Sequence, residues 1–241
     1  MVAAINTYIL YSPIEKDRTA RVDAMRQQFK NFTISESIYP SLTRIPFLDA
    51  IIKKSKERTG KALMATEVAC LLGHRRILRQ IVKAATNNEE HFLVLESDSK
   101  ILNFELLKNN FEPISKKYDF FFWGAWEGNA KIKRSKSQKI EGGYTIGEPL
   151  LNTIYCTYGY SLNKPTAQYL LKHSSKISTP FDIFKQFVDP HKIRLGTITK
   201  EIITTWDEGS YIRNDKFWKR TKKSVFIFFL NIKNSIEAYF S

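Results

Sequence analysis

The chain has 241 residues, 43% of them hydrophobic, and a net charge of +14 at pH 7. This length and composition predict one soluble globular domain with a full core, with or without an appendage. The longest apolar run, residues 225–230, is far shorter than the roughly 20 residues that span a bilayer. Two cysteines, Cys70 and Cys156, exclude a disulfide framework, and we expect core thiols in a reducing compartment.

The positive charge calls for an anionic partner: nucleic acid, an anionic membrane surface or an anionic substrate. Charge alone does not choose among the three. Residues 1–11 lack the basic leader of a secretory signal and fit a first strand better. We therefore expect a cytosolic protein.

Apolar patterns along the chain predict alternating strands and helices, and hence an α/β layered sheet. In chain order we expect a strand at 5–11, a helix at 18–29, a strand and loop at 35–46, a helix at 66–85, strands at 92–95 and 118–123, a mobile basic loop at 131–139, a strand at 153–162, a helix at 165–173 and a strand at 193–203. The helix at 66–85 is the clearest, because its apolar residues form one stripe.

The strongest functional signal is an apolar run that ends in two acids, Phe92-Leu93-Val94-Leu95-Glu96-Ser97-Asp98. Four consecutive apolar residues predict an interior strand, and open α/β sheets bind ligands outside the carboxyl ends of such strands. Glu96 and Asp98 are two residues apart, so on an extended backbone their side chains point the same way. Two adjacent carboxylates repel each other unless a cation or a shared proton relieves them. We expect a divalent cation that also holds phosphate oxygens, and the alternative is a solvated loop.

Residues 216–241 differ from the rest of the chain. Five cations precede an aromatic and aliphatic run, and spaced apolar residues follow it: Lys216, Lys219, Arg220, Lys222 and Lys223, then residues 225–230, then Ile232, Ile236, Tyr239 and Phe240. Such a segment can lie in a membrane interface, where each cation near an anionic leaflet adds on the order of 1 kcal/mol. The tail is therefore predicted to hold the protein at an anionic membrane surface. The alternative is a terminal helix that packs on the domain through its aromatic residues.

Several short motifs occur together and in a fixed order. They are Thr66-Glu67-Val68-Ala69-Cys70-Leu71-Leu72-Gly73-His74, Leu95-Glu96-Ser97-Asp98, Tyr118-Asp119-Phe120-Phe121, Gly159-Tyr160-Ser161-Leu162, Pro180-Phe181-Asp182 and Ser210-Tyr211-Ile212. With these motifs the chain resembles glycosyltransferase family 25, the bacterial lipooligosaccharide galactosyltransferases and their collagen-modifying relatives. The resemblance covers residues 5–212. Three positions depart from the family pattern, because Ser97 replaces an acid, Gly73 replaces a serine and Thr66 replaces a glycine.

The resemblance implies a GT-A-like, Rossmann-type mixed sheet flanked by helices, with a catalytic domain at 1–215 and the basic amphipathic tail at 216–241. It implies an inverting hexosyltransferase whose most typical donor is UDP-galactose, with UDP-glucose open, and whose acceptor is a lipooligosaccharide or lipopolysaccharide core sugar. Mn²⁺ or Mg²⁺ is the implied cofactor, since a Lewis acid offsets the charge of the leaving diphosphate.

By analogy with DxD sites, Asp98 is the first choice for direct metal ligation, and Glu96 would contact the donor ribose or the metal through water. His191 is a possible third metal ligand, against a plain surface histidine. Asp182 is the best candidate for the catalytic base, and a helix cap is its alternative role. Asp189 and Glu148 are weaker candidates for the base.

Three further residues are expected to bind the donor. Glu67 and His74 are seven residues apart on a helix, so they share a face with Cys70 between them. They reach the donor, or they bond neighbouring backbone and fix the helix; both interpretations remain open. Ser12 follows the first strand and is the third candidate. The basic residues 131–139 would form a lid over the donor.

Two other functions compete with this one, a nucleic-acid-binding protein and a non-catalytic protein on a membrane surface. No nucleic-acid-binding module is recognisable, so we expect no nucleic-acid partner. The prediction is an enzyme on the inner face of the bacterial inner membrane, with a UDP-sugar donor and a glycolipid acceptor.

Overall fold

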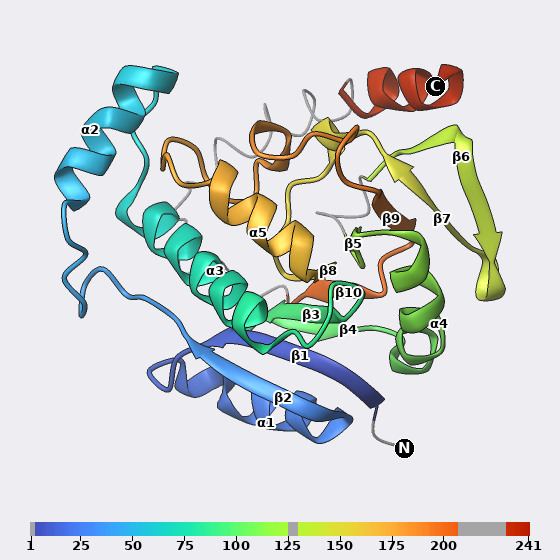
Figure 1. The fold of residues 1–241 in the computed structure, drawn as a ribbon, viewed down its shortest axis with the longest axis horizontal. Coiled ribbons are helices and arrows are strands. Elements are labelled where there is room, and N and C mark those ends of the chain that lie inside the picture. The colour runs from blue at the N-terminus through green and yellow to red at the C-terminus, as the bar shows by residue number, and fades with distance from the viewer. Residues whose placement is uncertain (1–2, 125–129, 207–229) are drawn as a thin grey trace.

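The computed structural model describes residues 3–124, 130–206 and 230–241. Eight strands form one mixed sheet: β1 (Ala3–Tyr11), β2 (Phe29–Glu36), β3 (His91–Glu96), β5 (Phe120–Phe122), β6 (Ile132–Ile140), β7 (Tyr144–Pro149), β8 (Gly159–Asn163) and β9 (Leu195–Thr199). Their order across the sheet is β2-β1-β3-β8-β5-β9-β7-β6. Two short strands, β4 (Ser99–Ile101) and β10 (Ile203–Thr205), pair beside it (Figure 1).

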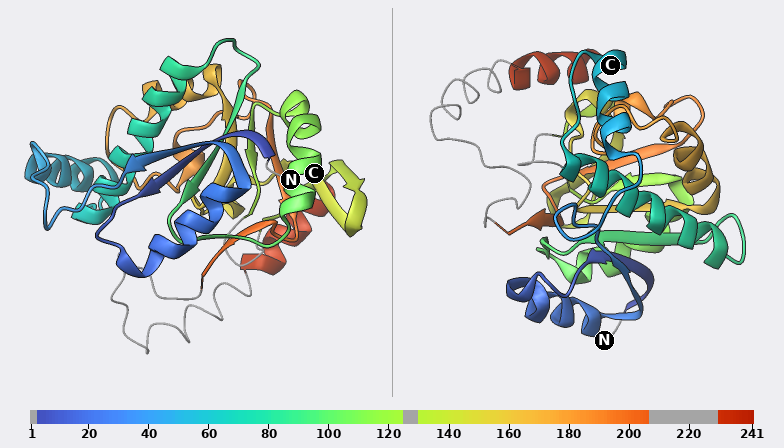
Figure 2. Two further views of the ribbon diagram at one scale, coloured as in Figure 1. Left: turned by 90° about the horizontal axis from the view of Figure 1, so that it is seen from below. Right: turned by 90° about the vertical axis from the view of Figure 1, so that its left-hand side faces the viewer.

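Helices lie on both sides of this sheet (Figures 1 and 2), which confirms the predicted mixed α/β architecture. They are α1 (Thr19–Gln28), α2 (Leu48–Thr59), α3 (Ala65–Ala84), α4 (Phe104–Lys117) and α5 (Lys164–His173), with single turns η1 (Lys16–Arg18), η3 (Glu141–Gly143), η4 (Leu151–Thr153) and η5 (Phe184–Gln186). A further helix covers residues 230–240. Neither α2 nor α4 was anticipated, and the strand expected from residue 35 ends at Glu36, because residues 37–46 are not in a strand.

The acidic strand lies in the interior of the sheet, as predicted. β3 is parallel to β1 and antiparallel to β8, and its residues 92–95 are fully buried. Leu10 of β1 pairs with Glu96 of β3. Because β1 and β3 run the same way, the residues that follow both strands emerge at one edge of the sheet.

The two faces of the sheet are covered by different helices. Gly73 of α3 packs directly on β1, where a Cβ would lie 2.9 Å from Leu10 Cδ1. On β8, Tyr160 faces His74 of α3, whereas its neighbour Ser161 accepts a hydrogen bond from Trp123 Nε1. Trp123 stacks on Phe111 of α4 at 5.8 Å between ring centroids. Successive strand residues point to opposite faces, so α3 and α4 cover opposite sides.

The basic segment 131–139 was expected to be a mobile loop, and this prediction was wrong. Ile132–Ile140 forms β6, which pairs antiparallel with β7 at the sheet edge. Gly142 and Gly143 adopt positive φ of 68° and 72° and make the turn between the two strands. β6 is mostly exposed and lysine-rich, as is common for an edge strand. It therefore lacks the alternation of apolar and polar residues by which a half-buried strand is recognised in a sequence.

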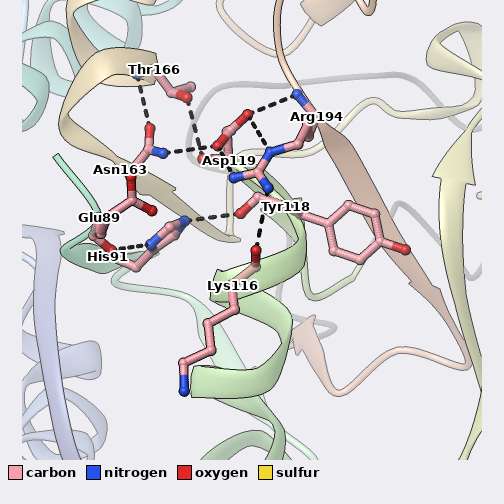
Figure 3. A network of polar contacts seen from close by, with 8 residues as sticks. All are labelled: Glu89, His91, Lys116, Tyr118, Asp119, Asn163, Thr166 and Arg194. Atoms are coloured by element: carbon pink, nitrogen blue, oxygen red, sulfur yellow. Dashed lines mark hydrogen bonds and ion pairs between the residues drawn. The ribbon is translucent and has the colours of Figure 1, made fainter.

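A polar network ties the sheet together at the end away from the acids (Figure 3). Asp119 Oδ1 accepts hydrogen bonds from Arg194 Nη2 at 2.6 Å and Asn163 Nδ2 at 3.1 Å, and Asp119 Oδ2 accepts one from Arg194 Nε at 3.0 Å. His91 Nε2 contacts the Tyr118 carbonyl at 2.9 Å. The network joins the starts of β3, β5 and β9 to the end of β8, so the Tyr118-Asp119 motif has a structural role.

The helix at 230–240 packs on the domain through one of its faces. Asn234 and Ala238 are buried, and Asn234 Oδ1 accepts a hydrogen bond from Asn152 Nδ2 at 3.1 Å. The Arg134 guanidinium of β6 lies 4.3 Å from the Tyr239 ring centre. The predicted boundary at residue 215 and the five cations of the tail lie outside the described residues. Within the described residues, no helix has the length and apolarity needed to cross a membrane.

Candidate functional site

Glu96 ends β3 with one carboxylate oxygen fixed and the other available. Oε1 lies 3.0 Å from His74 Nε2 and also accepts a hydrogen bond from the Thr157 hydroxyl. Burial alone would raise the pKa of Glu96, but the hydrogen bonds from His74 and Thr157 lower it. Glu96 is therefore a carboxylate held in one orientation. Among the described residues, Oε2 has no hydrogen-bond partner.

His74 orients Glu96 and connects it to the Pro180-Phe181-Asp182 motif. Its side chain is fully buried, and Nδ1 lies 2.9 Å from the Tyr160 hydroxyl. Because Nε2–H donates to the Glu96 carboxylate, a neutral ring accepts the Tyr160 proton at Nδ1. The Phe181 ring stacks on His74 at 4.9 Å and 13°. This stacking packs the Pro180-Phe181-Asp182 motif against α3, and the charge of Asp182 acts on Cys70 of the same helix.

Asp98 does not continue the extended strand, because β3 ends at Glu96 and residues 97–98 form a turn. The expectation of two side chains pointing the same way from one strand was therefore wrong. Asp98 Oδ2 lies 3.6 Å from Arg18 Nη2, and Oδ1 is buried without a hydrogen-bond partner among the described residues. Burial and the negative charge of Glu96 raise the pKa of Asp98 to about 6. The two acids remain close enough to repel each other.

Ser97, between the acids, joins a buried network with η1. Its hydroxyl donates a hydrogen bond to Glu15 and accepts one from Arg18 Nη1 at 2.7 Å. Arg18 Nη1 also lies 3.1 Å from Glu15 Oε2. Glu15 thus supplies the negative charge beside Arg18. Sequence reasoning missed both residues, because only the fold brings them to the end of β3.

Trp206 contacts the backbone of Asp98, and two cations lie over its ring. The Trp206 backbone N–H donates to the Asp98 backbone carbonyl at 3.1 Å. Lys100 Nζ lies 4.3 Å and Arg21 Cζ 4.6 Å from the centre of the indole ring. This ring with two cations over it was not anticipated, because Arg21, Lys100 and Trp206 are far apart in the sequence. The arrangement can contact an anionic, flat ligand.

The pKa of Cys70 shows how many acids lie around the centre of the site. Its pKa is raised well above the usual range, first by burial and then by the charges of four acids, which are Glu96, Asp182, Asp98 and Glu67. The structure therefore brings together the acids that the motifs supply separately. Together with Glu15, the pair Glu96 and Asp98 has three negative charges against one from Arg18, so a divalent cation fits this charge balance.

The remaining predicted residues have varied positions. Glu67 Oε2 accepts a hydrogen bond from the Met64 N–H at 2.8 Å and so caps α3, which favours the helix-fixing interpretation. Ser12 is buried, and its N–H donates to Glu15 Oε1 at 3.2 Å. Glu148 pairs with Lys133 on the β6–β7 hairpin.

His191 and Asp189 lie in an exposed turn. Asp189 Oδ1 accepts a hydrogen bond from the His191 N–H at 3.0 Å, and Lys192 Nζ lies 3.6 Å from Asp189 Oδ2. No contact among the described residues joins either side chain to Glu96 or Asp98. The one group of histidine, cysteine and acidic residues that is close enough to hold a metal ion, within the described part of the chain, is Cys70, His74 and Glu96.

Comparison with known proteins agrees with the motifs. The sequence pattern of glycosyltransferase family 25 (LPS biosynthesis protein) matches residues 15–185, which include His74, Glu96, Asp98 and Asp182. The chain belongs to glycosyltransferase family 25. It is therefore a glycosyltransferase of lipopolysaccharide biosynthesis, with a sugar donor and an acceptor as its partners.

The structural comparison is more distant. The chain is similar to 4-diphosphocytidyl-2C-methyl-D-erythritol synthase from Anaerococcus prevotii DSM 20548, at 13% identity over 82% of this chain and 88% of that chain, with a TM-score of 0.35. This likeness is too weak to carry over any function. No curated protein matches the chain.

Proposed function

We propose that this family 25 enzyme is a metal-dependent, inverting hexosyltransferase that moves galactose from UDP-galactose to a core sugar of lipooligosaccharide or lipopolysaccharide. One observation carries the metal dependence. Glu96 Oε2 and Asp98 Oδ1, at the end of β3, have no hydrogen-bond partner among the described residues, and Asp98 Oδ1 is buried. Buried polar atoms are normally bonded, so an unbonded carboxylate oxygen next to a second acid supports the proposal of a cation ligand here.

Oxygen ligands of this kind suit Mn²⁺ or Mg²⁺, with Asp98 as the direct ligand and Glu96 as a ligand or a donor contact. When bound, the ion would act as a Lewis acid that offsets charge on the departing diphosphate. His74 and Thr157 hold Glu96 in place, so its free oxygen stays aimed without loss of side-chain entropy. Lys100 and Arg21, beside Trp206, are placed to meet the negative donor.

Inversion requires a base on the face of the sugar opposite the leaving diphosphate, where it accepts the proton of the acceptor hydroxyl. Asp182 is our candidate for this base. The stacking of its chain neighbour Phe181 on His74 supports this choice, as does the effect of the Asp182 charge on Cys70. Asp182 and Asp98 thus belong to one constellation, although 84 positions separate them in the sequence.

The proposal is tested by a transfer and hydrolysis assay with a panel of UDP-sugars, with Mn²⁺ or with EDTA. We expect turnover of UDP-galactose that EDTA abolishes and that Asp98→Asn reduces at least a hundredfold. Asp119→Asn is the matched control, because its acid lies in the network at the other end of the sheet. Full turnover by Asp98→Asn would contradict the metal role, and turnover of UDP-glucose alone would correct the donor.

We also propose that the enzyme is cytoplasmic and attaches to the inner face of the inner membrane through its C-terminal segment. The helix at 230–240 supports this. Its exposed face has four apolar residues at helical spacing, Ile232, Ile236, Tyr239 and Phe240, and Phe240 is 82% exposed. The face opposite, with Asn234 and Ala238, packs on the domain. Five cations precede the helix in the sequence, and together these features suit an anionic bilayer surface.

A further inference from the structure

Cys70, His74 and Glu96 form a second potential cation site that overlaps the first. Cys70 and His74 are four residues apart on α3, so their side chains lie one above the other on the same face. The Cys70 sulfur, a His74 ring nitrogen and a Glu96 oxygen all lie within 4.8 Å of one another. These are a thiol, an imidazole and a carboxylate, which differ from the all-oxygen set proposed for Mn²⁺ or Mg²⁺.

We propose that this cluster binds a thiophilic divalent cation of the Zn²⁺ type. Thiolate and imidazole ligands favour Zn²⁺ over Mg²⁺ or Mn²⁺. Zinc ligands lie about 2.0–2.3 Å from the metal, so donor atoms that are up to 4.8 Å apart must approach one another by roughly 1 Å to close around it. Cys70 and Glu96 are partly exposed, so an ion has access from solvent, while the buried His74 forms the inner wall.

The field of the site favours cation binding at this point. The charges of Glu96, Asp182, Asp98 and Glu67 all act on Cys70 and oppose a free thiolate there. A bound divalent cation would compensate the negative charges of these acids, and it would stabilise the Cys70 thiolate by binding it as a ligand. The residual coordination position would be filled by water or by a nearby carboxylate.

Binding requires two proton rearrangements, and the number of protons released to the solvent can be measured. The Cys70 thiol loses its proton to the solvent as the sulfur–metal bond forms. His74 moves its remaining proton from Nε2 to Nδ1, so Nε2 binds the metal and Nδ1–H donates to the Tyr160 oxygen, now 2.9 Å away. Glu96 exchanges its bond from His74 for the metal and keeps the bond from Thr157. One proton is released for each ion bound.

The inference is independent of the galactosyl transfer proposed above, and its test therefore uses a spectroscopic signal. The full-length protein, freed of metal, is titrated with Cd²⁺, which gives an ultraviolet charge-transfer band when bound to a thiolate. Proton release is measured in a weakly buffered solution during the same titration. We expect one Cd²⁺ and one released proton for each chain, and Zn²⁺ should displace Cd²⁺ and suppress the band.

Cys156 provides the matched control, because it is buried and its thiol donates to the Gly124 carbonyl at 2.9 Å. Cys156→Ser should keep the band, whereas Cys70→Ser and Cys70→Ala should lose it while near-ultraviolet dichroism remains that of the wild type. Glu96→Gln should weaken Cd²⁺ binding at least tenfold. A band that survives in both Cys70 variants, or an unchanged Cd²⁺ affinity in Glu96→Gln, would overturn the assignment, as would the absence of any band in the wild type.

Discussion

Arg18 Nη2 lies 3.6 Å from Asp98 Oδ2, which is too long for a hydrogen bond and leaves the two residues as a loose ion pair. Arg18 Nη1 makes shorter hydrogen bonds, to Ser97 and Glu15. Asp98 is therefore only partly compensated, and the pKa of its carboxyl rises to about 6 through burial and the charge of Glu96. At neutral pH Asp98 is ionised, although burial and the charge of Glu96 disfavour its negative charge. A bound cation would relieve this unfavourable charge, so Asp98 is suited to be a cation ligand.

The first prediction follows from the sign of that shift. A carboxyl whose pKa is raised by folding stabilises the protein below the unfolded pKa near 3.9, and this contribution is lost as the pH rises through about 6. In metal-free protein, Asp98→Asn should therefore increase the free energy of unfolding at pH 7.5 by on the order of 1–3 kcal/mol. The gain should vanish near pH 4. Urea denaturation at both pH values in EDTA measures it, and a gain that does not change with pH would contradict the argument.

The second prediction concerns stabilisation by the metal ion. Mn²⁺ that binds only the folded protein should raise its melting temperature. At a free Mn²⁺ concentration one hundred times the dissociation constant, the free energy of unfolding should increase by about 2.7 kcal/mol. The rise should shrink below pH 6, because protons compete for Asp98. Differential scanning fluorimetry with and without Mn²⁺ tests this. Asp98→Asn should lose the rise and Asp119→Asn should keep it; a rise of the same size in Asp98→Asn would show that the ion binds elsewhere.

The third prediction separates a structural acid from the proposed functional ones. Burial opposes the charge of Asp119, but its hydrogen bonds with Arg194 lower the pKa of Asp119, so its stabilising effect is present above the unfolded pKa and is lost as the pH falls below it. Arg194 is half exposed, so solvent screens the pair, and Asp119→Asn should cost only about 1 kcal/mol. Chemical denaturation at pH 7.5 measures this loss. Turnover should stay at the wild-type value, and a large fall in turnover would instead indicate a catalytic role.

The fourth prediction tests the close approach of α3 to β1. A Cβ on Gly73 would lie 2.9 Å from Leu10 Cδ1, so Gly73→Ser should destabilise the protein by about 1–2 kcal/mol. The nearest atoms belong to a flexible side chain, so Leu10→Val should relieve part of the cost. A double-mutant cycle of unfolding free energies gives the coupling between the two positions. Strictly additive effects would mean that the added atoms are accommodated elsewhere.

The fifth prediction concerns the exposed apolar face of the C-terminal helix. Ile236→Glu combined with Phe240→Ser should reduce cosedimentation with vesicles of anionic phosphatidylglycerol at least tenfold, since both side chains are exposed and neither contributes to the core. Binding to neutral phosphatidylcholine should be weak for every variant. Leu42→Glu is the control, because Leu42 is 69% exposed on another part of the surface. Equal loss in the control would show that general hydrophobicity, and not this face, binds the vesicles.

The interior of the sheet could be predicted from the sequence because burial leaves a local pattern. The apolar run 92–95 and the stripe of the helix at 66–85 became β3 and α3 with their ends nearly in place. The edge hairpin could not, since β6 is exposed and its pairing depends on β7 and on the Gly142-Gly143 turn. An exposed lysine-rich strand and a basic loop have the same composition.

The site residues also fall into those that the sequence reveals locally and those that only the fold brings together. Glu96, Asp98, His74 and Asp182 lie in motifs that can be read locally, and the structure gathers them at one end of the sheet. Arg18 and Trp206 were missed, because nothing near them in the sequence marks an acid's counterion or an indole beside a metal ligand. Their roles arise only when η1 and β10 are brought to the end of β3.

The bond between Ser97 and Glu15 decides which part of the chain supplies the negative charge beside Arg18. The two residues lie 82 positions apart, yet Glu15 provides beside Arg18 the negative charge that an acid at position 97 would provide. The acid beside Arg18 therefore comes from the turn after β1, and this corner of the site exists only because the fold brings two distant stretches of polypeptide together.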